Sequence, residues 1–276
     1  MKIAGVVVLY NPDESVIGNI NSYIKDLELL YVFDNSEVKN ELIEKLKKIN
    51  KVKYFSVGKN VGIGFALNYV CDIAVKEGYD WLLTMDHDSY FEPNGVLKMI
   101  GEFEKKIGRD KEKIGVISPL IVYEGDKIEE EGNENFQKIP IAINSGSILN
   151  LKAFLKAGKF REDYFLDRID FEYSLRLRKQ GYELLRYNGS RLYHKLGSLK
   201  VYNFLLFKIR VTNHHPIRHY YMTKNAIDII KNYFKSFPSH CLYEIKSVIF
   251  DFCKVILFEK NKFEKIKMIF KGIFDS

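Results

Sequence analysis

Apolar runs of strand length alternate with segments of helical spacing through the first third of the chain. The runs are residues 3–9, 29–33, 52–57 and 81–85, and the first, IAGVVVL, is continuous and rich in β-branched side chains. Such a strand is typical of a sheet covered on both faces. Strands that alternate with helices need crossover connections, so the sequence predicts an α/β fold with a mostly parallel central sheet flanked by helices.

The three segments between these runs predict helices at residues 13–26, 37–50 and 60–78. In a sheet of this kind the ligand binds beyond the carboxyl ends of the strands. Polar residues stand where each expected strand ends, and we expect them to share one rim of the sheet. They are Asn11, Asp34, Asn60 and Asp86.

The sequence Met-Asp-His-Asp-Ser at residues 85–89 follows a buried strand directly. It places the carboxylates of Asp86 and Asp88 at the open end of the sheet. Carboxylate oxygens are ligands that Mg²⁺ and Mn²⁺ accept, and a cation held there would face a diphosphate. The alternative is an ordinary turn in which Asp86 caps the next helix and Asp88 is solvated.

A second acidic group precedes a basic stretch in DRIDFEYSLRLRKQG, residues 167–181. Asp170 and Glu172 are expected in the first turn of a helix, where negative charge is favourable on structural grounds alone. The functional interpretation is that Asp170 accepts a proton as a general base. Further along, a strand ending at His194 would deliver an imidazole nitrogen to the metal, although an isolated histidine is more often a surface or capping residue.

The loop KNVGIGFALN at residues 59–68 lacks the third glycine of a dinucleotide fingerprint and the Gly-Lys-Ser/Thr ending of a P-loop. Binding of NAD is therefore disfavoured, and a P-loop is excluded.

The net charge of +7 and the pI near 9.0 favour an anionic partner. Three scattered cysteines indicate buried thiols in a reducing compartment, and we expect a cytoplasmic protein with no membrane-spanning segment.

The second half of the chain is less regular. A strand is expected near residues 114–122 and a helix from about Ala153, and from about residue 203 the chain carries Phe, Lys and Ile at helical spacing. We therefore expect a catalytic domain at residues 1–200 and a helical region at 201–276, with a soft boundary between them.

Taken together, the motifs resemble those of inverting family 2 glycosyltransferases with the GT-A fold, and in particular the bacterial rhamnosyltransferases that use dTDP-rhamnose to build surface polysaccharides. They cover nearly the whole chain, and in order they are VVVLYNP, FDNS, GKNVGIGFALN, LLTMDHDS, INSGSILN, FLDRIDFEYSLRLRKQGY, YHKLG, HPIRHYYMTKNAI and KGIFD. The chain departs from the family pattern at His87, Tyr173 and Lys224, where Gln, Trp and Arg are usual.

The resemblance implies a role for each matching residue. The nucleotide-sugar donor is expected at Asn11, Asp34, Asn60, Gly62, Asn68 and Asp86. The donor sugar and the acceptor are expected at Asn144, Ser145, Gly146, Asp167 and Glu172. The metal, Mn²⁺ or Mg²⁺, is expected on Asp86, Asp88 and His194, with Asp170 as the base that activates a hydroxyl of a glycan or lipid-linked glycan.

Other functions remain open from the sequence. The donor could be UDP-glucose, UDP-galactose or UDP-galactofuranose. A nucleotidyltransferase would need a glycine-rich basic loop after the first strand, which is absent, and a non-enzymatic binder of nucleic acid would explain the charge without a recognisable module. Between Leu242 and Phe274, lysines interleave with apolar residues, which predicts either a helix docked on the inner membrane surface or an ordinary packed helix.

Overall fold

The computed structural model describes residues 1–38, 41–123, 135–194, 200–204 and 207–276. The chain forms two compact units. The first comprises Met1–Glu162 and Tyr173–Lys195, and the second comprises Asp163–Glu172 and Leu196–Ser276. Each is described by itself below. The soft boundary expected near residue 200 remains a prediction about domains; by their contacts, residues 163–172 belong with the C-terminal part of the chain.

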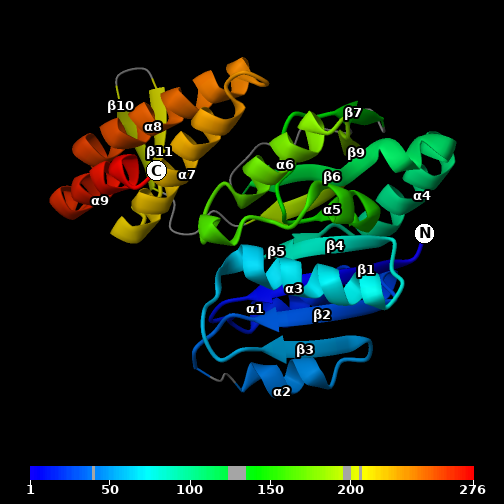
Figure 1. Cartoon of the computed structure of the whole chain (residues 1–276). Helices are drawn as coiled ribbons and strands as arrows, with labels where there is room; N and C mark the ends of the chain where they lie inside the picture. Colours follow the sequence, from blue (N-terminus) through cyan, green and yellow to red (C-terminus); the bar gives the residue numbers. More distant parts are fainter. Residues whose placement is uncertain (39–40, 124–134, 195–199, 205–206) are drawn as a thin grey trace. The chain divides into compact units, whose positions relative to one another are not determined.

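The first unit is built on one mixed sheet (Figure 1). Its strands follow in spatial order β3-β2-β1-β4-β8-β6-β9-β5, and β7 pairs with β9. In chain order they are β1 (Ile3–Leu9), β2 (Leu29–Asp34), β3 (Val52–Ser56), β4 (Trp81–Asp86), β5 (Ser89–Phe91), β6 (Ile114–Tyr123), β7 (Phe136–Lys138), β8 (Ser147–Asn150) and β9 (Glu183–His194).

The four N-terminal strands are parallel, as the alternating pattern predicts. Every residue of β1 is buried, because the strand lies inside the sheet and helices cover both faces. Their register brings the carboxyl ends together: Leu9 is opposite Asp34, Asp34 is opposite Ser56, and Val8 is opposite Asp86. The predicted common rim is therefore confirmed for these strand ends.

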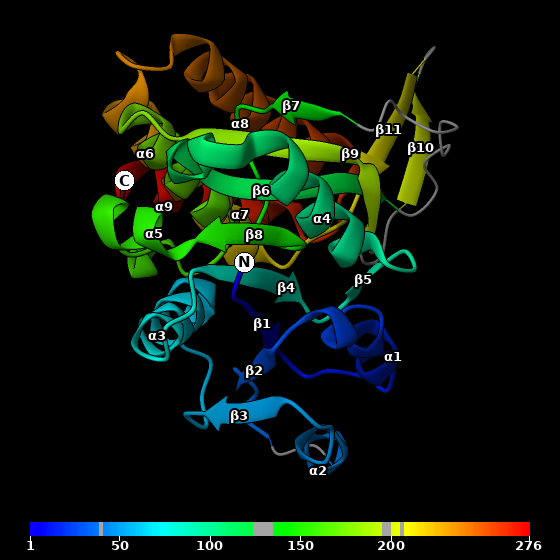
Figure 2. The same cartoon turned by 90° about the vertical axis from the view of Figure 1, so that its right-hand side faces the viewer.

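Helices lie on both faces of the sheet, with α3 and α5 on one face and α1 on the other (Figure 2). The α-helices that precede β9 in the chain are α1 (Ser15–Asn21), α2 (Leu42–Lys47), α3 (Gly62–Lys76), α4 (Gly95–Ile107), α5 (Leu151–Ala157) and α6 (Ile169–Lys179). Short 3-10 turns are η1 (Ile24–Asp26), η2 (Gly108–Lys113) and η3 (Glu162–Tyr164).

Local chemistry explains where these helices begin and how closely they pack. The side chain of Asn150 accepts hydrogen bonds from the backbone N–H groups of Lys152 and Ala153, so α5 begins two residues before the expected Ala153. In α3, a Cβ atom at Gly64 would lie 2.9 Å from the carbonyl oxygen of Arg161, so only glycine permits this approach. The first expected helix is shorter than predicted, since α1 ends at Asn21 and a 3-10 turn follows.

The second unit carries the C-terminal helices and a hairpin. Its helices are α7 (Pro216–Tyr233), α8 (Pro238–Phe258) and α9 (Lys262–Phe274), and its hairpin strands are β10 (Lys200–Phe204) and β11 (Phe207–Val211). The expectation of helical structure from about residue 203 is thus wrong for residues 203–204 and 207–211, which form antiparallel strands. Helix α7 starts at Pro216 because proline fits the first turn and His215 caps it.

Helices α7 and α9 approach closely at Gly272, where a Cβ atom would lie 2.6 Å from the carbonyl oxygen of Tyr220. Within the described residues, no helix is both long enough and apolar enough to cross a membrane.

Candidate active site

Two carboxylates and one imidazole converge in the first unit. Asp86 is the last residue of β4, Asp88 follows two residues later, and His194 ends β9. One ligand atom of each lies within 4.8 Å of the other two, and Asp88 Oδ1 is 3.7 Å from His194 Nδ1. Two hard oxygen donors with one nitrogen suit Mn²⁺ or Mg²⁺, so the residues present fit the predicted ion.

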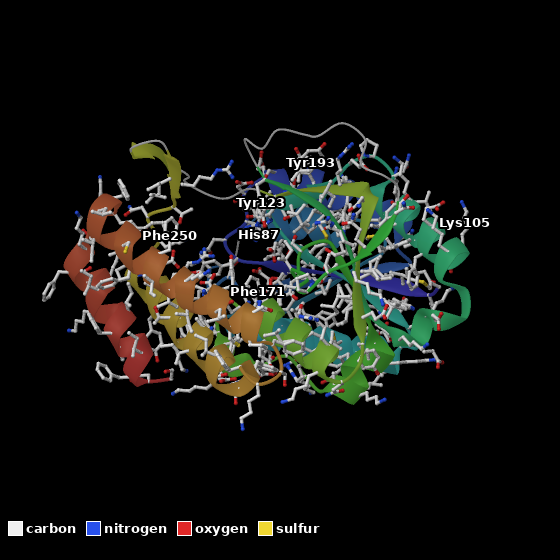
Figure 3. All side chains as sticks on the ribbon, turned by 90° about the horizontal axis from the view of Figure 1, so that it is seen from above. His87, Lys105, Tyr123, Phe171, Tyr193 and Phe250 are labelled. Atoms are coloured by element: carbon white, nitrogen blue, oxygen red, sulfur yellow. The ribbon has the colours of Figure 1, made fainter. Side chains whose placement is uncertain are left out.

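Pairing between β5 and β9 explains why His194 reaches this group. Ser89 lies opposite His194 in the antiparallel register, and Ser89 Oγ is 2.6 Å from His194 Nδ1. The ring of Tyr123 packs edge-on against the imidazole, with ring centroids 6.0 Å apart. In Figure 3, Tyr123 and His87 lie toward one end of the first unit and Lys105 of α4 lies at the other. The residues of the YHKLG motif that follow His194 lie outside the described residues.

The electrostatics of the group favour a cation. The pKa of the Asp86 carboxyl is raised to about 6, first by burial and then by the negative charge of Asp88, against a smaller opposing effect of His87. Two carboxylates held this close repel each other unless positive charge lies between them. A divalent cation would relieve that repulsion.

The segment Asn144-Ser145-Gly146 lies directly against the end of β4. The backbone N–H of Asp86 donates to Ser145 Oγ at 3.2 Å, and the backbone N–H of Gly146 donates to the Thr84 carbonyl at 2.8 Å. Gly146 has φ +80°, and a Cβ atom there would lie 2.8 Å from Leu192. The predicted sugar-side segment and the metal group are thus brought together by β4.

Asn19 is a residue of this site that the sequence did not indicate. Its Nδ2 donates to the carbonyl oxygen of His87 at 2.8 Å, which fixes the backbone between Asp86 and Asp88. The contact spans the 68 positions from α1 to the metal turn, so no local pattern points to it.

The rim of β1 and β2 forms a polar corner around Asp34. Its Oδ1 accepts from the backbone N–H of Ser36 at 2.9 Å, and its Oδ2 accepts from the Tyr54 hydroxyl at 2.8 Å. Burial and the bond to Asp34 raise the pKa of Tyr54 to about 12, so the phenol remains a donor at neutral pH. The backbone N–H of Asn11, which has φ +46°, donates to Ser36 Oγ at 2.8 Å.

Asn35 joins this corner to the start of α3. Its backbone N–H donates to the Leu9 carbonyl at 2.9 Å, and its buried side chain donates to the Gly62 carbonyl at 3.2 Å. Asn60 Oδ1 in turn accepts from the backbone N–H of Gly62 at 3.0 Å. Asn11, Asp34, Asn60 and Gly62 are therefore connected through Asn35 and Ser36, which the sequence analysis did not name as site residues.

Asn68 has a different environment. It is buried on α3, its Nδ2 donates to the Phe160 carbonyl and to Glu162 at 2.9 Å each, and its Oδ1 accepts from the Phe160 backbone N–H at 2.8 Å. These contacts show that Asn68 holds the segment after α5. Contact between Asn68 and the donor stays a prediction.

The predicted base and its flanking acids lie in the part of α6 and its preceding turn that belongs to the second unit. Asp170 Oδ1 accepts from the Phe171 backbone N–H at 3.0 Å. Glu172 is buried and accepts from the Tyr233 hydroxyl at 2.7 Å, and Asp167 is bound by Arg218. The predicted helix start is confirmed, and the catalytic and sugar-binding roles of these acids remain predictions.

Tyr173, one of the departures from the family pattern, has a packing role. Its ring is buried and stacks on Phe160, with ring centroids 4.0 Å apart. An aromatic side chain at this position is therefore explained by the core.

A mostly parallel sheet with a metal-ligating group at the carboxyl ends of its strands is the arrangement of nucleotide-sugar-dependent glycosyltransferases with the GT-A fold. Residues 6–156 match glycosyl transferase family 2, and this match covers more than half of the 276 residues. The chain belongs to glycosyl transferase family 2.

Relatives with assigned names support the family. The chain is 24% identical to a dTDP-rhamnosyl transferase, RfbF, of Shigella flexneri, over 96% of this chain and 92% of that one. It is 25% identical to an uncharacterized glycosyltransferase, the MG060 homolog of Mycoplasma pneumoniae, over 72% of this chain and 71% of that one.

Solved structures show the same fold. S. aureus TarS 1–349 in complex with UDP-GlcNAc has a TM-score of 0.62 at 15% identity, with 99% of this chain and 81% of that chain covered. GalNAc-T7 with UDP, GalNAc and Mn²⁺ also has a TM-score of 0.62, at 13% identity and with 87% of this chain covered. The chain spans about half of GalNAc-T7, 49% of its length.

Proposed function

We propose that this glycosyltransferase moves rhamnose from dTDP-rhamnose to a hydroxyl of a glycan or lipid-linked glycan in surface polysaccharide synthesis. The similarity to the Shigella flexneri dTDP-rhamnosyl transferase supports this choice, because it extends over 96% of the chain and not only over the nucleotide-binding half. Asp86, Asp88 and His194 converge at the ends of β4 and β9, and this observation supports a metal-dependent transfer.

The proposed reaction is a single displacement with inversion at the anomeric carbon. Asp170 takes the proton of the acceptor hydroxyl, the acceptor oxygen forms a bond to the anomeric carbon, and the bond from that carbon to the diphosphate oxygen breaks. Asp86, Asp88 and His194 would hold Mn²⁺ or Mg²⁺, which would offset the negative charge that grows on the departing diphosphate. Asp34, Asn11 and Asn60 hold the nucleotide at the rim of β1 and β2.

The competing proposal is a different donor. The TarS structure is a complex with UDP-GlcNAc, and the GalNAc-T7 structure contains UDP and GalNAc, so the fold itself accommodates uridine nucleotides. A UDP-hexose such as UDP-glucose, UDP-galactose or UDP-galactofuranose is thus the second candidate. A non-enzymatic binder of nucleic acid is disfavoured by membership of a transferase family.

A donor panel tests the proposal. The purified protein with Mn²⁺ is mixed with dTDP-rhamnose or each UDP-hexose, and release of nucleoside diphosphate is measured with water taking the sugar in place of the acceptor hydroxyl. The proposal expects release from dTDP-rhamnose to exceed release from every UDP-sugar. Preferential release of UDP would contradict the proposed donor and replace rhamnose by the corresponding hexose.

We also propose that the C-terminal helices contact the inner surface of the cell membrane. Phe263 and Phe274 of α9 have 83% and 82% of their surface exposed, and Phe250 projects from α8 with 53% exposed (Figure 3). Exposed lysines stand beside these apolar residues, which suits a helix at an anionic lipid surface. Such a position would bring a lipid-linked acceptor to the enzyme.

A further inference from the structure

The turn that precedes α6 has an unusual backbone. Asp167 and Arg168 are consecutive residues with φ +60°, although neither is glycine. Side chains disfavour this left-handed region, so two such residues in succession persist only where the surrounding structure holds them. The carbonyl oxygen of Arg168 accepts the backbone N–H of Glu172 at 3.0 Å, which is the first hydrogen bond of α6. The strained turn therefore sets the direction of the helical turn that carries Asp170.

Helix α7 holds the turn from one side. The guanidinium of Arg218 binds the Asp167 carboxylate with two donors, Nε to Oδ2 at 2.9 Å and Nη2 to Oδ1 at 2.8 Å. The amide of Asn225 donates to the carbonyl oxygens of Leu166 and Asp167, at 2.9 Å each. Side chain and backbone of the turn are thus fixed by the same helix.

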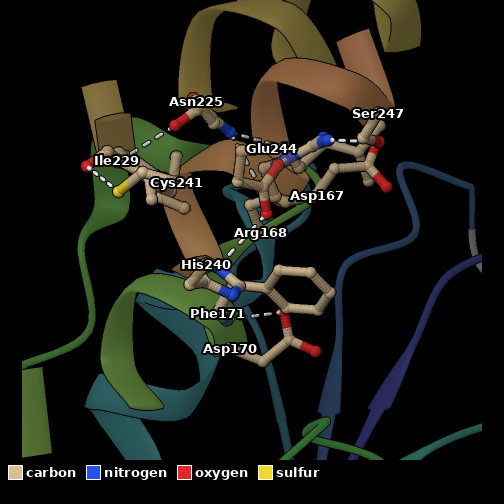
Figure 4. Close-up of polar contacts among 12 residues, drawn as sticks. Asp167, Arg168, Asp170, Phe171, Asn225, Ile229, His240, Cys241, Glu244 and Ser247 are labelled. Carbon is tan, nitrogen blue, oxygen red and sulfur yellow. Dashed lines mark hydrogen bonds and ion pairs between the residues drawn. The ribbon is translucent and has the colours of Figure 1, made fainter. Parts of the chain in front are cut away.

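Helix α8 also holds the turn (Figure 4). Arg168 Nε donates to Glu244 Oε2 at 2.7 Å, in a pair whose side chains are 8% and 0% exposed. His240 Nε2 lies 3.3 Å from the other Glu244 oxygen. Burial alone raises the pKa of Glu244, but the nearby imidazole of His240 and the charge of Arg168 outweigh it, so the pKa lies below its usual value. Glu244 is thus held as a carboxylate opposite Arg168.

We propose that Asp167, Arg168, Arg218, Asn225 and Glu244 form a clamp on the 167–168 turn that sets the position of Asp170, and that all five are positioning residues. The proposal rests on the proposed role of Asp170 as the base. It gives Asp167 a task other than the sugar contact expected from the sequence. Because a base misplaced by about 1 Å loses much of its rate, the clamp should act on kcat more than on binding.

The test uses the less buried arm of the clamp, since removal of one partner from the Arg168–Glu244 pair threatens folding. Asp167→Ala and Arg218→Gln should each lower kcat about tenfold to a hundredfold with KM for the donor and for the acceptor unchanged. Asp167→Asn, which tolerates the left-handed backbone and keeps one acceptor oxygen, should retain more activity than Asp167→Ala. The kcat of the double variant should lie within about threefold of the kcat of the less active single variant, because both single changes break the same interaction.

Asp275→Asn is the matched control. Asp275 accepts from the Tyr220 hydroxyl at 2.9 Å and so also contacts α7, but it does not touch the turn. It should leave kcat unchanged. If Asp167 contacts the sugar instead, the KM for the acceptor should rise in the Asp167 variants alone, and the losses of activity should add in the double variant. Either result overturns the clamp.

Amide hydrogen exchange separates the clamp from the proposed reaction. In Arg218→Gln, the peptide covering residues 163–172 should exchange faster than in the unaltered protein, with the rest of α7 unchanged. This result would support the clamp even if no donor were turned over, in which case only the proposed function would fail. Unchanged exchange in this peptide would overturn the clamp whatever the activity.

Discussion

At the scale of single residues, the carboxylates of this chain have different tasks because their surroundings differ. Asp34 is held by Ser36 and Tyr54, Asp86 is half-buried beside Asp88, and Asp170 lies in the first turn of a helix. The residues that a pattern could name are those at strand and helix ends. Asn19 and Tyr54 could not be named, because their contacts arise from the sheet register and from chain segments far apart.

We expect Asp170→Asn to lower turnover by about two to four orders of magnitude, which is the contribution typical of a general base. An amide has nearly the same shape but cannot accept the proton, so binding of the nucleotide should change little. Steady-state kinetics and a nucleotide titration on the purified variant would measure both. Turnover near that of the unaltered protein would rule out this role for Asp170.

A fall in pH should lower the stability of the second unit, because His214 becomes protonated. Burial, then the positive charge of Arg218, lowers the pKa of this imidazole to about 4. In the unfolded chain the pKa of this imidazole is about 6.5, so the unfolded state binds the proton more readily than the folded state does. The free energy of unfolding should therefore fall as the pH drops from about 6.5 towards 4. After allowance for solvent screening we expect about 1–2 kcal/mol from this residue.

Urea unfolding at pH 7 and at pH 5 would measure the effect. In His214→Gln the loss of stability between these two pH values should be smaller than in the unaltered protein. An equal loss in both proteins would show that other groups cause it.

At the scale of elements, the strands were predictable and the hairpin was not. The run IAGVVVL becomes β1 with its predicted bounds, because an all-buried strand needs apolar residues at every position. In the part of the chain that the structure describes, strands β10 and β11 pair with each other and with no other strand. Their Phe, Lys and Ile residues satisfy a helical spacing equally well. The left-handed turn at Asp167 could not be predicted from the sequence either, because it is held by side chains of the distant helices α7 and α8.

The C-terminal helices show how structure changes a prediction. Lys265, expected among the lipid-facing lysines, is 2% exposed and donates to Glu259 at 2.7 Å and to Asn213 at 2.8 Å. Lys254 is paired with Asp251. Lys262, Lys267 and Lys271 of α9 are exposed and stay available for a lipid surface.

We therefore expect the protein to sediment with anionic liposomes at low salt, and to do so less at high salt, since each lysine near the surface contributes on the order of 1 kcal/mol. Replacement of Lys262, Lys267 and Lys271 by Gln should reduce sedimentation. Lys47→Gln, Lys105→Gln and Lys113→Gln in the first unit are a matched control with the same change of charge. Absence of the protein from the pellet at low salt would contradict membrane docking.

At the scale of the whole molecule, the family membership and the fold indicate a nucleotide-sugar-dependent transferase. A cation held by Asp86, Asp88 and His194 would hold the diphosphate of the donor. Sequence motifs could predict this much because the carboxyl ends of parallel strands must meet at one rim. They could not predict that residues 163–172 group with the C-terminal unit, because this grouping depends on contacts made by distant helices.

The most direct test of this account is the binding of dTDP measured by isothermal titration calorimetry, with Mn²⁺, with EDTA, and with Asp88→Asn in Mn²⁺. We expect the dissociation constant to rise at least about tenfold on chelation and in the variant, because a cation held between Asp86, Asp88 and His194 would bridge to the diphosphate. Glu102→Gln on α4 is the control and should bind as the unaltered protein does. Equal affinity for dTDP with Mn²⁺, with EDTA and in Asp88→Asn would contradict a metal-dependent donor site.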